Sequence, residues 1–598
     1  MIFYSAGVKI SGFLSKFVLK LTILLALETN TTVTTDKEAC RILVSLLEKH
    51  GVEEAVVSPG SRNAPLMMAL SASGSIRCTV VIDERSAAFI ALGKASVTGR
   101  PVVLVCTSGT ALLNYAPAVA EAYYRKVSLI VVSADRPVEW IDQDDSQTLR
   151  QYEALANYVK GNYNIPADCS APARRWYVNR MVNDALISAT SGRQAPVHIN
   201  VQLDAPLGDM EGWHDTRWTE RTVGMIQPDQ RLSHADAAAL AAIVSKSPRV
   251  LVIAGFHNPD VALRDALERL SLRGNVAVMT ETISNLSSPR FINAIDSVLS
   301  IMSEDELDHM RPDLVITVGG AIVSRFIKQY LRRVHPDEHW HVGLSDTTID
   351  CFQSLTQRID MEAAPFFSGL LSVIDEDCIA CCQSGYYEEW MALDCSARKI
   401  HSDFLQSAPW SDLRAVSTLM DAVPEGTALQ LSNGTSVRYA QLFPALQCSR
   451  ADSNRGVSGI DGSTSTAIGA ASAFPNRLTM LLTGDMSAQY DIGALAAPCI
   501  PPTFRMAVLC NGGGGIFRFI DATRSMPILD RFLVADRPFP LRQLADAYGF
   551  AYLEASSEAE LVAVLPGFFS PSDRPVILAI NTPGDVSANI LRDYLGLQ

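Results

Sequence analysis

Short apolar runs and longer stretches of helical periodicity alternate along most of the chain. The apolar runs are rich in Val, Ile and Leu, which is typical of strands buried on both faces of a parallel sheet. A turn rich in Gly or Ser follows many of them and leads into a helical pattern; residues 40–47 already show such a pattern before the first run. This alternation predicts an α/β fold with doubly wound parallel sheets covered by helices.

The apolar runs fall into three blocks, and each block predicts one domain. The predicted strands span residues 54–57, 80–82, 102–106, 129–133 and 197–202 in the first block, 250–254, 276–279, 314–318 and 339–342 in the second, and 427–431, 479–482, 506–509 and 576–580 in the third. The expected division of the chain is a disordered extension at 1–35, domains at 36–207, 235–375 and 410–598, and a linker at 376–409.

Composition and charge narrow the class of protein. The chain has 598 residues, a formal net charge of -14 and a pI near 5.3. A nucleic-acid-binding protein is expected to carry a broad positive face, so this balance argues against that class. Anionic small molecules stay open as substrates, because a few arginines in a cleft set the local field.

Twelve cysteines are too sparse in a chain of this length to predict a disulfide framework. One cluster, Cys378, Cys381 and Cys382 with Cys395 and His401 further on, raises zinc binding as an alternative. A structural zinc site needs two well-separated ligand pairs, and the second pair is loosely spaced in a helix-like stretch. A zinc-binding interaction module is therefore the weakest interpretation of the chain.

The first 35 residues combine Lys9, Lys16 and Lys20 with short apolar patches. A signal peptide needs a longer uninterrupted apolar segment and a small-residue cleavage site, and this stretch has neither. No other segment contains the roughly 20 apolar residues of a membrane span. We expect a dispensable extension, and the cytoplasm is the default location.

The strongest chemical signal lies in the third block, after two predicted strands. Gly484-Asp485-Met486-Ser487 follows the strand at 479–482, and Asn511 with the glycines 512–515 follows the strand at 506–509. If these strands are adjacent, a carboxylate and a carboxamide oxygen reach one point, which is hard oxygen ligation suited to Mg²⁺ and diphosphate. Either motif alone is common in turns. The prediction of a metal and diphosphate site therefore depends on finding both motifs, each directly after a strand.

This pair of motifs resembles the diphosphate and metal motif of thiamine-diphosphate enzymes. The resemblance implies thiamine diphosphate as cofactor, with Mg²⁺ (Mn²⁺ as an alternative) held by Asp485, the Asn511 side chain and the Gly513 carbonyl. It also implies a pyrimidine-binding first domain, a central second domain and a diphosphate-binding third domain. One departure is Cys510, which stands where the family often has a further Asn, beside the metal-binding position.

A second carboxylate is expected in the first block. Asp83-Glu84 follows the strand predicted at 80–82 and begins a helical pattern, where ordinary helix capping also favours an acid. The resemblance assigns Glu84 to the aminopyrimidine N1′ of the cofactor, where a shared proton promotes the imino tautomer. Two further cofactor contacts are implied at Ser108 and Gly109, in the segment after the strand at 102–106.

Finer motifs resemble one family among the thiamine-diphosphate enzymes, the 2-succinyl-5-enolpyruvyl-6-hydroxy-3-cyclohexene-1-carboxylate (SEPHCHC) synthases of menaquinone biosynthesis. The similarity spans residues 36–598 and is weakest in the middle block. Its most specific strings are Ser-Pro-Gly-Ser-Arg at 58–62 and Ser-Asn-Arg-Gly-Val-Ser-Gly-Ile-Asp-Gly at 453–462.

The resemblance implies substrate-binding groups that suit dicarboxylates, because a guanidinium binds a carboxylate in a bidentate fork. These groups are Arg62, Gln147, Arg438, Arg455 and a basic residue of the middle block, for which Arg325 stands at the matching position and Lys328 one turn on. A single surface arginine is more often a solvated salt bridge, so the number of arginines at strand ends carries this interpretation.

Apolar residues complete the implied site. Ile460 would support the bent cofactor, and Ile516 with Phe517 would line the acceptor pocket, although plain core packing explains these three residues equally well. Ser146 stands where the family often has Asn, and the resemblance implies that this difference changes one hydrogen bond to substrate.

The implied reaction is decarboxylation of 2-oxoglutarate followed by conjugate addition of the succinyl-semialdehyde carbanion to isochorismate. Because Glu84 and Asp485 lie in different blocks, the cofactor must bridge two domains, and the resemblance places these on different subunits. A homodimer is then the minimum active unit, and a homotetramer is an alternative. The competing interpretations are another thiamine-diphosphate enzyme, such as a 2-oxo acid decarboxylase or acetolactate synthase, and a non-catalytic sensor with the same fold.

Overall fold

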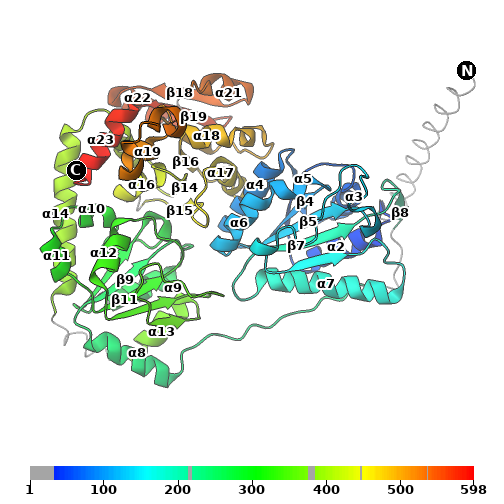
Figure 1. Ribbon diagram of the computed structural model, residues 1–598, viewed down its shortest axis with the longest axis horizontal. Helices are drawn as coiled ribbons and strands as arrows, with labels where there is room; N and C mark the ends of the chain where they lie inside the picture. Colours follow the sequence, from blue (N-terminus) through cyan, green and yellow to red (C-terminus); the bar gives the residue numbers. More distant parts are fainter. Residues whose placement is uncertain (1–32, 213–218, 375–383, 445–446, 535–536, 598) are drawn as a thin grey trace, which may run out of the picture. The chain divides into compact units, whose positions relative to one another are not determined.

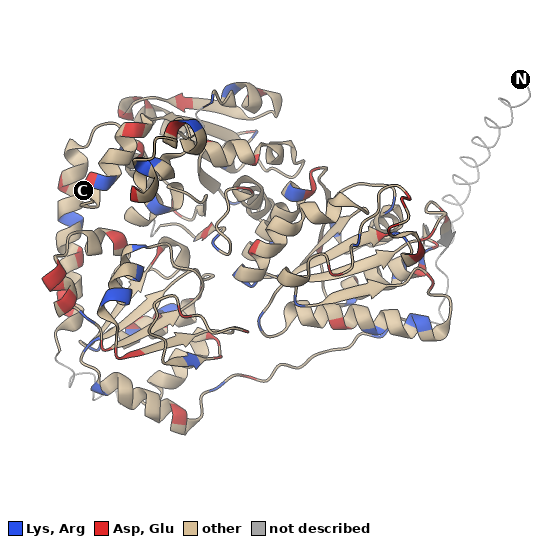
Figure 2. Cartoon of the chain, viewed as in Figure 1, with Lys and Arg blue, Asp and Glu red and all other residues tan. Residues whose placement is uncertain are grey.

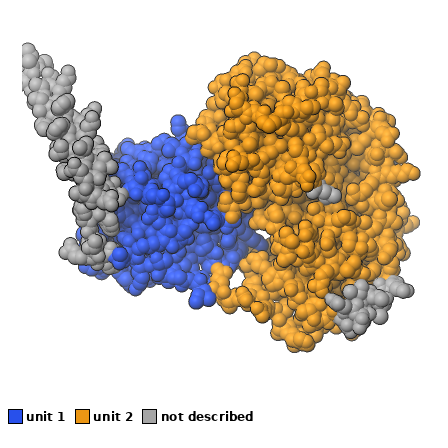
Figure 3. Space-filling model, turned by 180° about the vertical axis from the view of Figure 1, so that it is seen from behind, with its two compact units in different colours: residues 1–95, 99–226 blue, residues 96–98, 227–598 orange. Residues whose placement is uncertain are grey.

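The computed structural model describes residues 33–212, 219–374, 384–444, 447–534 and 537–597. The chain divides into two compact units, unit 1 (residues 1–95 and 99–226) and unit 2 (96–98 and 227–598) (Figure 3). Unit 1 contains one large parallel sheet, and unit 2 contains two, the central sheet and the C-terminal sheet (Figure 1). Helices lie between successive strands of all three, so the α/β fold with three parallel sheets is confirmed.

Unit 1 is built on a six-stranded parallel sheet with the order β3-β2-β4-β5-β7-β6. Its strands are β2 (Glu54–Val57), β3 (Arg77–Val80), β4 (Val102–Cys106), β5 (Leu129–Asp135), β6 (Asn162–Ile165) and β7 (Val197–Gln202). Its helices are α2 (Glu38–Lys49), α3 (Ala64–Ala72), α4 (Glu84–Thr98), α5 (Thr110–Asn114), α6 (Ala116–Arg125) and α7 (Pro172–Thr190), with short 3-10 turns at Val138–Trp140 and Ala156–Tyr158.

Residues beyond both predicted boundaries of the first domain pair or bond with it. Residues Val33–Thr35 form β1, which pairs antiparallel with β8 (Met210–Gly212), so the last residues of the predicted extension belong to the fold. Beyond residue 207, Glu220 accepts hydrogen bonds from Ser45 Oγ at 2.8 Å and Lys49 Nζ at 3.3 Å on α2. Residues 1–32 lie outside the described part of the chain.

The central sheet of unit 2 has five parallel strands in the order β10-β9-β11-β12-β13. Its strands are β9 (Val250–Ala254), β10 (Val276–Thr280), β11 (Leu314–Val318), β12 (Glu338–Val342) and β13 (Gln357–Ile359). The accompanying helices are α8 (His234–Lys246), α9 (Val261–Leu270), α10 (Ile295–Ser300), α11 (Glu304–His309), α12 (Phe326–Val334), α13 (Ala363–Leu371) and α14 (Tyr386–Ser407), with a 3-10 turn at Thr282–Ser284.

The C-terminal sheet of unit 2 has six parallel strands in the order β15-β14-β16-β17-β19-β18. Its strands are β14 (Ala428–Leu431), β15 (Arg450–Ser453), β16 (Thr479–Gly484), β17 (Phe504–Cys510), β18 (Ala551–Ala555) and β19 (Val576–Asn581). Its helices are α15 (Asp412–Asp421), α16 (Ser436–Leu442), α17 (Ser463–Ala473), α18 (Asp485–Tyr490), α19 (Gly515–Phe519), α20 (Asp521–Arg524), α21 (Leu541–Ala547), α22 (Glu558–Phe569) and α23 (Gly584–Tyr594), with a 3-10 segment at Ile492–Ala496 and a π-helical turn at Leu529–Val534.

The sheet of unit 1 and the C-terminal sheet share one topology. Numbered from their own first strands, both have the order 2-1-3-4-6-5, so the direction of winding reverses beside the first strand in each. Ligands bind at such reversal points, beyond the carboxyl ends of the strands. The segments after β2 and β4 in unit 1, and after β14 and β16 in unit 2, lie at these points.

The two sheets of unit 2 are joined by a shared apolar core. Ile283, just after β10, and Val323, after β11, pack in the same buried cluster as Leu431, Val437 and Tyr439 of the C-terminal sheet and its helices. This contact joins loops of the central sheet to α16, whereas the predicted division treated the two regions as separate domains. Lys and Arg are interspersed with Asp and Glu over both units (Figure 2).

The predicted linker at 376–409 contains α14, which runs for 22 residues. Trp390 and Tyr386 on this helix are buried against the central sheet, with their rings 6.2 Å apart. Of the proposed zinc cluster, the three cysteines at 378, 381 and 382 lie outside the described residues. Cys395 is exposed, and His401 is buried with Nε2 3.0 Å from the Ser297 carbonyl.

Within the described ranges no group of three or more His, Cys, Asp or Glu side chains is arranged to hold a metal ion. The same residues include no helix of the length and apolarity that a bilayer crossing requires.

Burial of α14 makes a prediction about stability. Replacing Trp390 by Ala should lower the free energy of unfolding by about 3 kcal/mol, because a large buried ring leaves a cavity. Ile400→Ala, at a half-exposed position on the same helix, should change it by less than about 0.5 kcal/mol. Urea denaturation followed by circular dichroism measures both, and equal effects would show that α14 is not anchored through Trp390.

Candidate functional site

The carboxylate of Asp485 lies against the glycine loop that follows β17. Its Oδ2 accepts hydrogen bonds from three successive backbone N–H groups, those of Asn511 at 3.1 Å, Gly512 at 3.1 Å and Gly513 at 2.9 Å. Burial raises the pKa of this carboxyl, and the N–H donors oppose that rise. Since β16 and β17 are neighbours in the sheet, the structure brings together the residues that the sequence predicted would meet.

A buried acid that the sequence analysis missed orients Asn511. Asn511 Nδ2 donates to Asp412 Oδ2 at 2.8 Å, so its Oδ1 is the atom left to face a cation. Asp412 is itself held by its own N–H donating to Ser587 Oγ at 2.9 Å and by the Thr582 hydroxyl. Burial raises the pKa of Asp412. In the sequence, Ser411-Asp412 reads only as a helix start, which gives no hint of this contact.

The backbone of the glycine loop packs closely against Val534, and two of its positions require glycine. Gly513 has φ +82°, and a Cβ there would lie 2.8 Å from the Val534 carbonyl oxygen. Gly514 has φ +57°, and its Cβ would meet the Val534 Cα at 2.6 Å. The loop therefore presents backbone N–H and C=O groups at short range, which fits a diphosphate and its metal.

A cavity of about 330 Å³ opens beside this loop. Asp485, Cys510 and Gly512 line it. Arg542 also lines it and forms a salt bridge of 2.7 Å with Glu554. The predicted metal-binding carboxylate thus faces an open space of ligand size.

The predicted apolar residues lie around the same loop system. Ser487 Oγ donates to the Ile460 carbonyl at 3.0 Å, which ties the start of α18 to the segment after β15. Ile460, Ile516 and Phe517 are each half-buried, with Ile516 packed against the core of the C-terminal sheet. Partial burial leaves part of each side chain available to line a pocket.

Four cations predicted as substrate-binding groups or their alternatives gather within unit 2, and we call Arg325, Lys328, Arg438 and Arg455 the basic cluster. Burial, together with the nearby charges of Arg325 and Arg455, lowers the pKa of Arg438 to about 10. Its Nε is buried and has no hydrogen-bond partner among the residues that the structure describes. A half-buried guanidinium with an unused donor beside two other cations fits an anionic ligand.

Arg325 and Lys328 differ in what they contact. Lys328 Nζ donates to the Ile322 carbonyl at 2.5 Å, and burial lowers its pKa. Arg325 is exposed as the N-cap residue of α12, and in the described ranges its guanidinium forms no ion pair or hydrogen bond. Arg325 is therefore the more available of the two for a ligand.

Arg455 is positioned by an asparagine. Its Nη1 donates to Asn433 Oδ1 at 2.9 Å, and Asn433 Nδ2 donates to the carbonyls of Asn454 at 2.6 Å and Gly459 at 2.7 Å. Asn433 follows β14 and residues 454–462 follow β15, a strand that the sequence analysis did not predict.

In unit 1, Glu84 is the first residue of α4 and does not cap it. Asp83 is the N-cap, and its carboxylate accepts from the N–H groups of Arg85 at 3.0 Å and Ser86 at 3.4 Å. The capping explanation for an acid at this position is thus satisfied by Asp83. No hydrogen bond or salt bridge engages the Glu84 carboxylate within the described residues, and the side chain is half-buried.

The segments after β2 and β4 carry the other predicted residues of unit 1. Arg62 Nη1 donates to the Leu203 carbonyl at 2.9 Å, and burial, aided by the nearby charge of Arg136, lowers the Arg62 pKa. Gln147 Nε2 donates to the Ser108 carbonyl at 2.8 Å, so a predicted substrate-binding residue contacts a predicted cofactor-binding one.

Gln151 is a further residue that sequence reasoning missed. It is fully buried, and its Oε1 accepts from the Gly109 N–H at 2.7 Å while its Nε2 donates to Asn200 Oδ1 at 3.0 Å. Gly109 has φ +84°, and a Cβ there would lie 2.8 Å from the Gln147 Cγ. Gln151 therefore holds the segment on which the predicted cofactor contacts Ser108 and Gly109 lie.

Comparison with known proteins agrees with this geometry. Residues 37–154 match the family model described as thiamine pyrophosphate enzyme, N-terminal TPP binding domain. The chain is 40% identical to the 2-succinyl-5-enolpyruvyl-6-hydroxy-3-cyclohexene-1-carboxylate synthase of Porphyromonas gingivalis over 94% of this chain and 97% of that protein. Identity to the synthases of the same name is 37% in Bacteroides fragilis, over 94% and 98%, and 34% in Flavobacterium johnsoniae, over 92% and 97%.

The close packing of the glycine loop makes a prediction about cofactor binding. Gly513→Ala should weaken thiamine-diphosphate binding in the presence of Mg²⁺ at least about tenfold, because an L-residue at positive φ costs roughly 1–2 kcal/mol before the contact with Val534 is counted. Gly567→Ala is the matched control, since Gly567 lies in α22 and its Cβ would meet nothing within 4 Å. Fluorescence titration with the cofactor measures both, and equal affinities would contradict a close backbone approach at Gly513.

Proposed function

Because the chain belongs to the family of 2-succinyl-5-enolpyruvyl-6-hydroxy-3-cyclohexene-1-carboxylate synthases, we propose that it decarboxylates 2-oxoglutarate and adds the remaining four-carbon unit to isochorismate, forming SEPHCHC and CO₂ in menaquinone biosynthesis. The observation that carries the proposal is the basic cluster of unit 2, since both substrates are dicarboxylates. A decarboxylase acting on a neutral 2-oxo acid side chain would have no need of several converging cations.

Thiamine diphosphate, when bound, supplies the electron sink for decarboxylating a 2-oxo acid and for forming the new carbon–carbon bond. Asp485, Asn511 Oδ1 and the Gly513 carbonyl are proposed to hold Mg²⁺, with Mn²⁺ as the alternative ion. Their oxygens are the hard ligands that Mg²⁺ prefers, and Asp412 orients the Asn511 amide accordingly. Gly484, Met486 and Ser487 are proposed to contact the diphosphate from the start of α18.

Glu84 is proposed to hold a proton at the aminopyrimidine N1′ of the cofactor, which a carboxyl group within hydrogen-bond reach can exchange. Its carboxylate is suited to this role because Asp83 caps α4 in its place. Ser108 and Gly109, held by Gln147 and Gln151, are proposed to face the cofactor from the same unit.

The substrate carboxylates are proposed to bind to guanidinium groups. In unit 2, Arg438 offers a buried Nε and Arg325 an uncommitted guanidinium, and Arg455 is preoriented by Asn433. In unit 1, Arg62 and Gln147 are proposed to bind the second substrate. Ile460, Ile516 and Phe517 are proposed to exclude water, which would otherwise protonate the reacting carbon.

The assembly and location are part of the proposal. Glu84 belongs to unit 1 and Asp485 to unit 2, and we propose that the complete site uses Glu84 of one chain and Asp485 of another. A homodimer is then the minimum active form, with a homotetramer as the alternative. The cytoplasm is the proposed location.

Product analysis tests the function. The purified protein is incubated with thiamine diphosphate, Mg²⁺, 2-oxoglutarate and isochorismate, and the products are identified by mass spectrometry. A cyclohexene adduct carrying the succinyl unit, absent when the cofactor is omitted, is the expected result. Free succinic semialdehyde with no adduct would identify a decarboxylase instead, and cofactor binding without turnover would identify a sensor.

Glu84→Gln should lower kcat by about 10²–10⁴-fold, which is the usual contribution of a positioned general acid–base. The substitution removes the exchangeable carboxyl proton but keeps the size of the side chain. Glu53→Gln, on an exposed pair with Arg100, serves as the control and should leave kcat within about twofold. Full activity in Glu84→Gln would remove Glu84 from the proposed mechanism.

A further inference from the structure

Glu281 is a buried acid at the carboxyl end of β10 that the proposed mechanism does not use. Both of its oxygens are engaged by backbone N–H groups: Oε1 and Oε2 accept from Val323 at 3.0 and 2.8 Å, and Oε1 also accepts from Ser324 at 2.7 Å. The residue is 5% exposed. A buried carboxylate costs free energy unless it is hydrogen-bonded, and these bonds supply that compensation.

These bonds fix the segment that carries Arg325. Val323 and Ser324 come directly before Arg325, the N-cap residue of α12. Ser324 is held from a second side, because its hydroxyl donates to Asp296 of α10 and accepts from the Ile327 N–H at 3.2 Å. The backbone at Arg325 is therefore held by two acids from two different elements.

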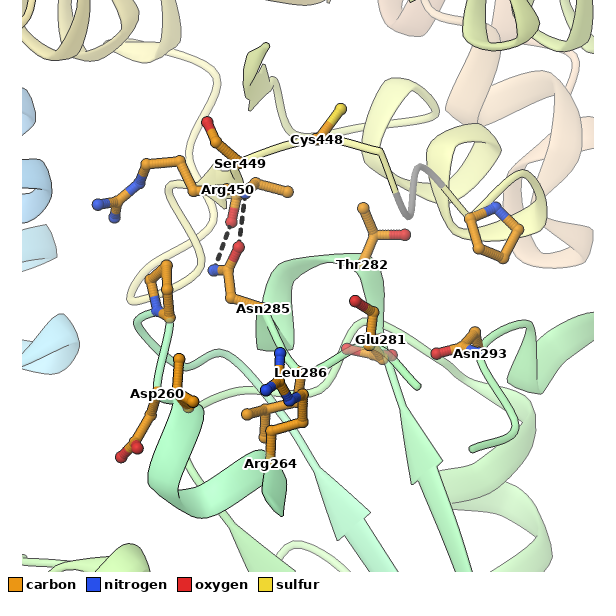
Figure 4. Close-up of a pocket in the computed structure, with 15 residues that line it drawn as sticks. Asp260, Arg264, Glu281, Thr282, Asn285, Leu286, Asn293, Cys448, Ser449 and Arg450 are labelled. Atoms are coloured by element: carbon orange, nitrogen blue, oxygen red, sulfur yellow. Dashed lines mark hydrogen bonds between the residues drawn. The ribbon is translucent and has the colours of Figure 1, made fainter. Parts of the chain in front are cut away.

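The residue that follows Glu281 in the chain forms hydrogen bonds to α16, the helix that carries Arg438. The Thr282 N–H donates to Gln441 Oε1 at 2.6 Å, and the Thr282 hydroxyl donates to the Ala440 carbonyl at 3.3 Å. Arg438 lies on the same helix, α16, and its Nη1 lies 3.4 Å from the Val323 carbonyl. Three residues beyond Thr282, the Asn285 amide forms two hydrogen bonds with the Ala451 backbone of β15, at 2.9 and 2.6 Å (Figure 4).

The charges around Glu281 belong mainly to the basic cluster. Lys328 of α12 and Asp296 of α10 act on Glu281 directly, and Glu281 in turn raises the pKa of Arg438 of α16. Burial, the largest cause, raises the pKa of Glu281 to about 7. Glu281 and Asp296 thus lie as two buried acids among the four cations of the basic cluster.

We propose that Glu281 is a positioning residue that fixes the 321–325 loop against α16, and thereby sets Arg325 and Arg438 at the spacing needed by a dicarboxylate substrate. The inference rests on the proposed function, in which Arg325 and Arg438 bind substrate carboxylates. Glu281 cannot itself bind such a substrate, because its charge repels a carboxylate and its oxygens are already bonded to backbone.

A cavity lined by Glu281 supports an indirect role of this residue in substrate binding. Glu281, Thr282 and Asn285 line a pocket of about 330 Å³, and Figure 4 shows Asp260, Arg264 and Arg450 around it. None of the four members of the basic cluster lines this pocket. Glu281 therefore reaches the basic cluster through the bonds of the 321–325 loop.

Glu281→Gln tests the proposal with little change in volume. The amide NH₂ places a donor against the N–H groups of Val323 and Ser324, so the loop must shift. We expect the KM for one of the two dicarboxylates to rise about tenfold, the effect of losing one hydrogen bond to a charged group, with kcat within about threefold. Glu304→Gln, at an exposed site on α11, is the matched control and should change neither value.

A double variant separates a positioning role from a general loss of stability. If Glu281 acts through Arg325, the KM of Glu281→Gln/Arg325→Ala should equal that of Arg325→Ala within about twofold, whereas independent effects would multiply. Multiplying effects would overturn the proposal. So would an unchanged KM in Glu281→Gln, or a lower one, since a lower KM would mean that Glu281 only offsets positive charge.

Two controls keep the outcome interpretable. Thiamine-diphosphate affinity, measured by fluorescence titration, should be unchanged in Glu281→Gln, because the glycine loop is not touched; a parallel loss of affinity would overturn a role limited to the substrate. The wild-type product assay is run first. If the wild type forms no adduct, the proposed function fails; if the wild type is active and Glu281→Gln matches it, only the present inference fails.

Discussion

All strands of a parallel sheet end at one edge, and the candidate sites of this protein depend on that constraint. Because β16 and β17 are neighbours, the loops that follow them have to meet, and the Asp485 carboxylate lies on three N–H groups of the next loop. In the central sheet the same edge brings Glu281, after β10, to the loop after β11, although β9 lies between the two strands. Residues separated by tens of positions thus become neighbours without any local sequence signal.

Unit 2 also has to accommodate several buried charges close to one another. Cations crowded together repel one another, and burial lowers the pKa of Arg438 and Lys328. Buried acids at Glu281 and Asp296 offset part of that repulsion while they hold backbone groups. Removing one partner of such a set is costly because it leaves a charge without compensation, so the acids and cations are expected to act together.

The strands of the three parallel sheets that the sequence did not predict share a position in the fold. β6, β13, β15 and β18 all lie at the edge of a sheet, where one side has no strand to pair with and the alternation of apolar residues is weak. β15 is the extreme case, since its Arg450 and Asp452 form a buried ion pair at 2.7 Å within the strand. The packing of α14 was not visible in the sequence for a related reason: its burial depends on Trp390 and Tyr386 meeting the central sheet.

The sequence by itself determined the class of fold, the central strands and the order of the motifs that carry the chemistry. Each of these features depends only on local periodicity or on residues that are adjacent in the chain. Asp485 with the glycine loop and the arginines after strands could be identified in this way. Only the tertiary structure decided which side chains orient them: Asp412 for Asn511, Gln151 for Gly109, and Glu281 for the segment before Arg325. These contacts join residues 42 to 99 positions apart, and a hydrogen bond over that separation exists only once the sheets and helices have packed.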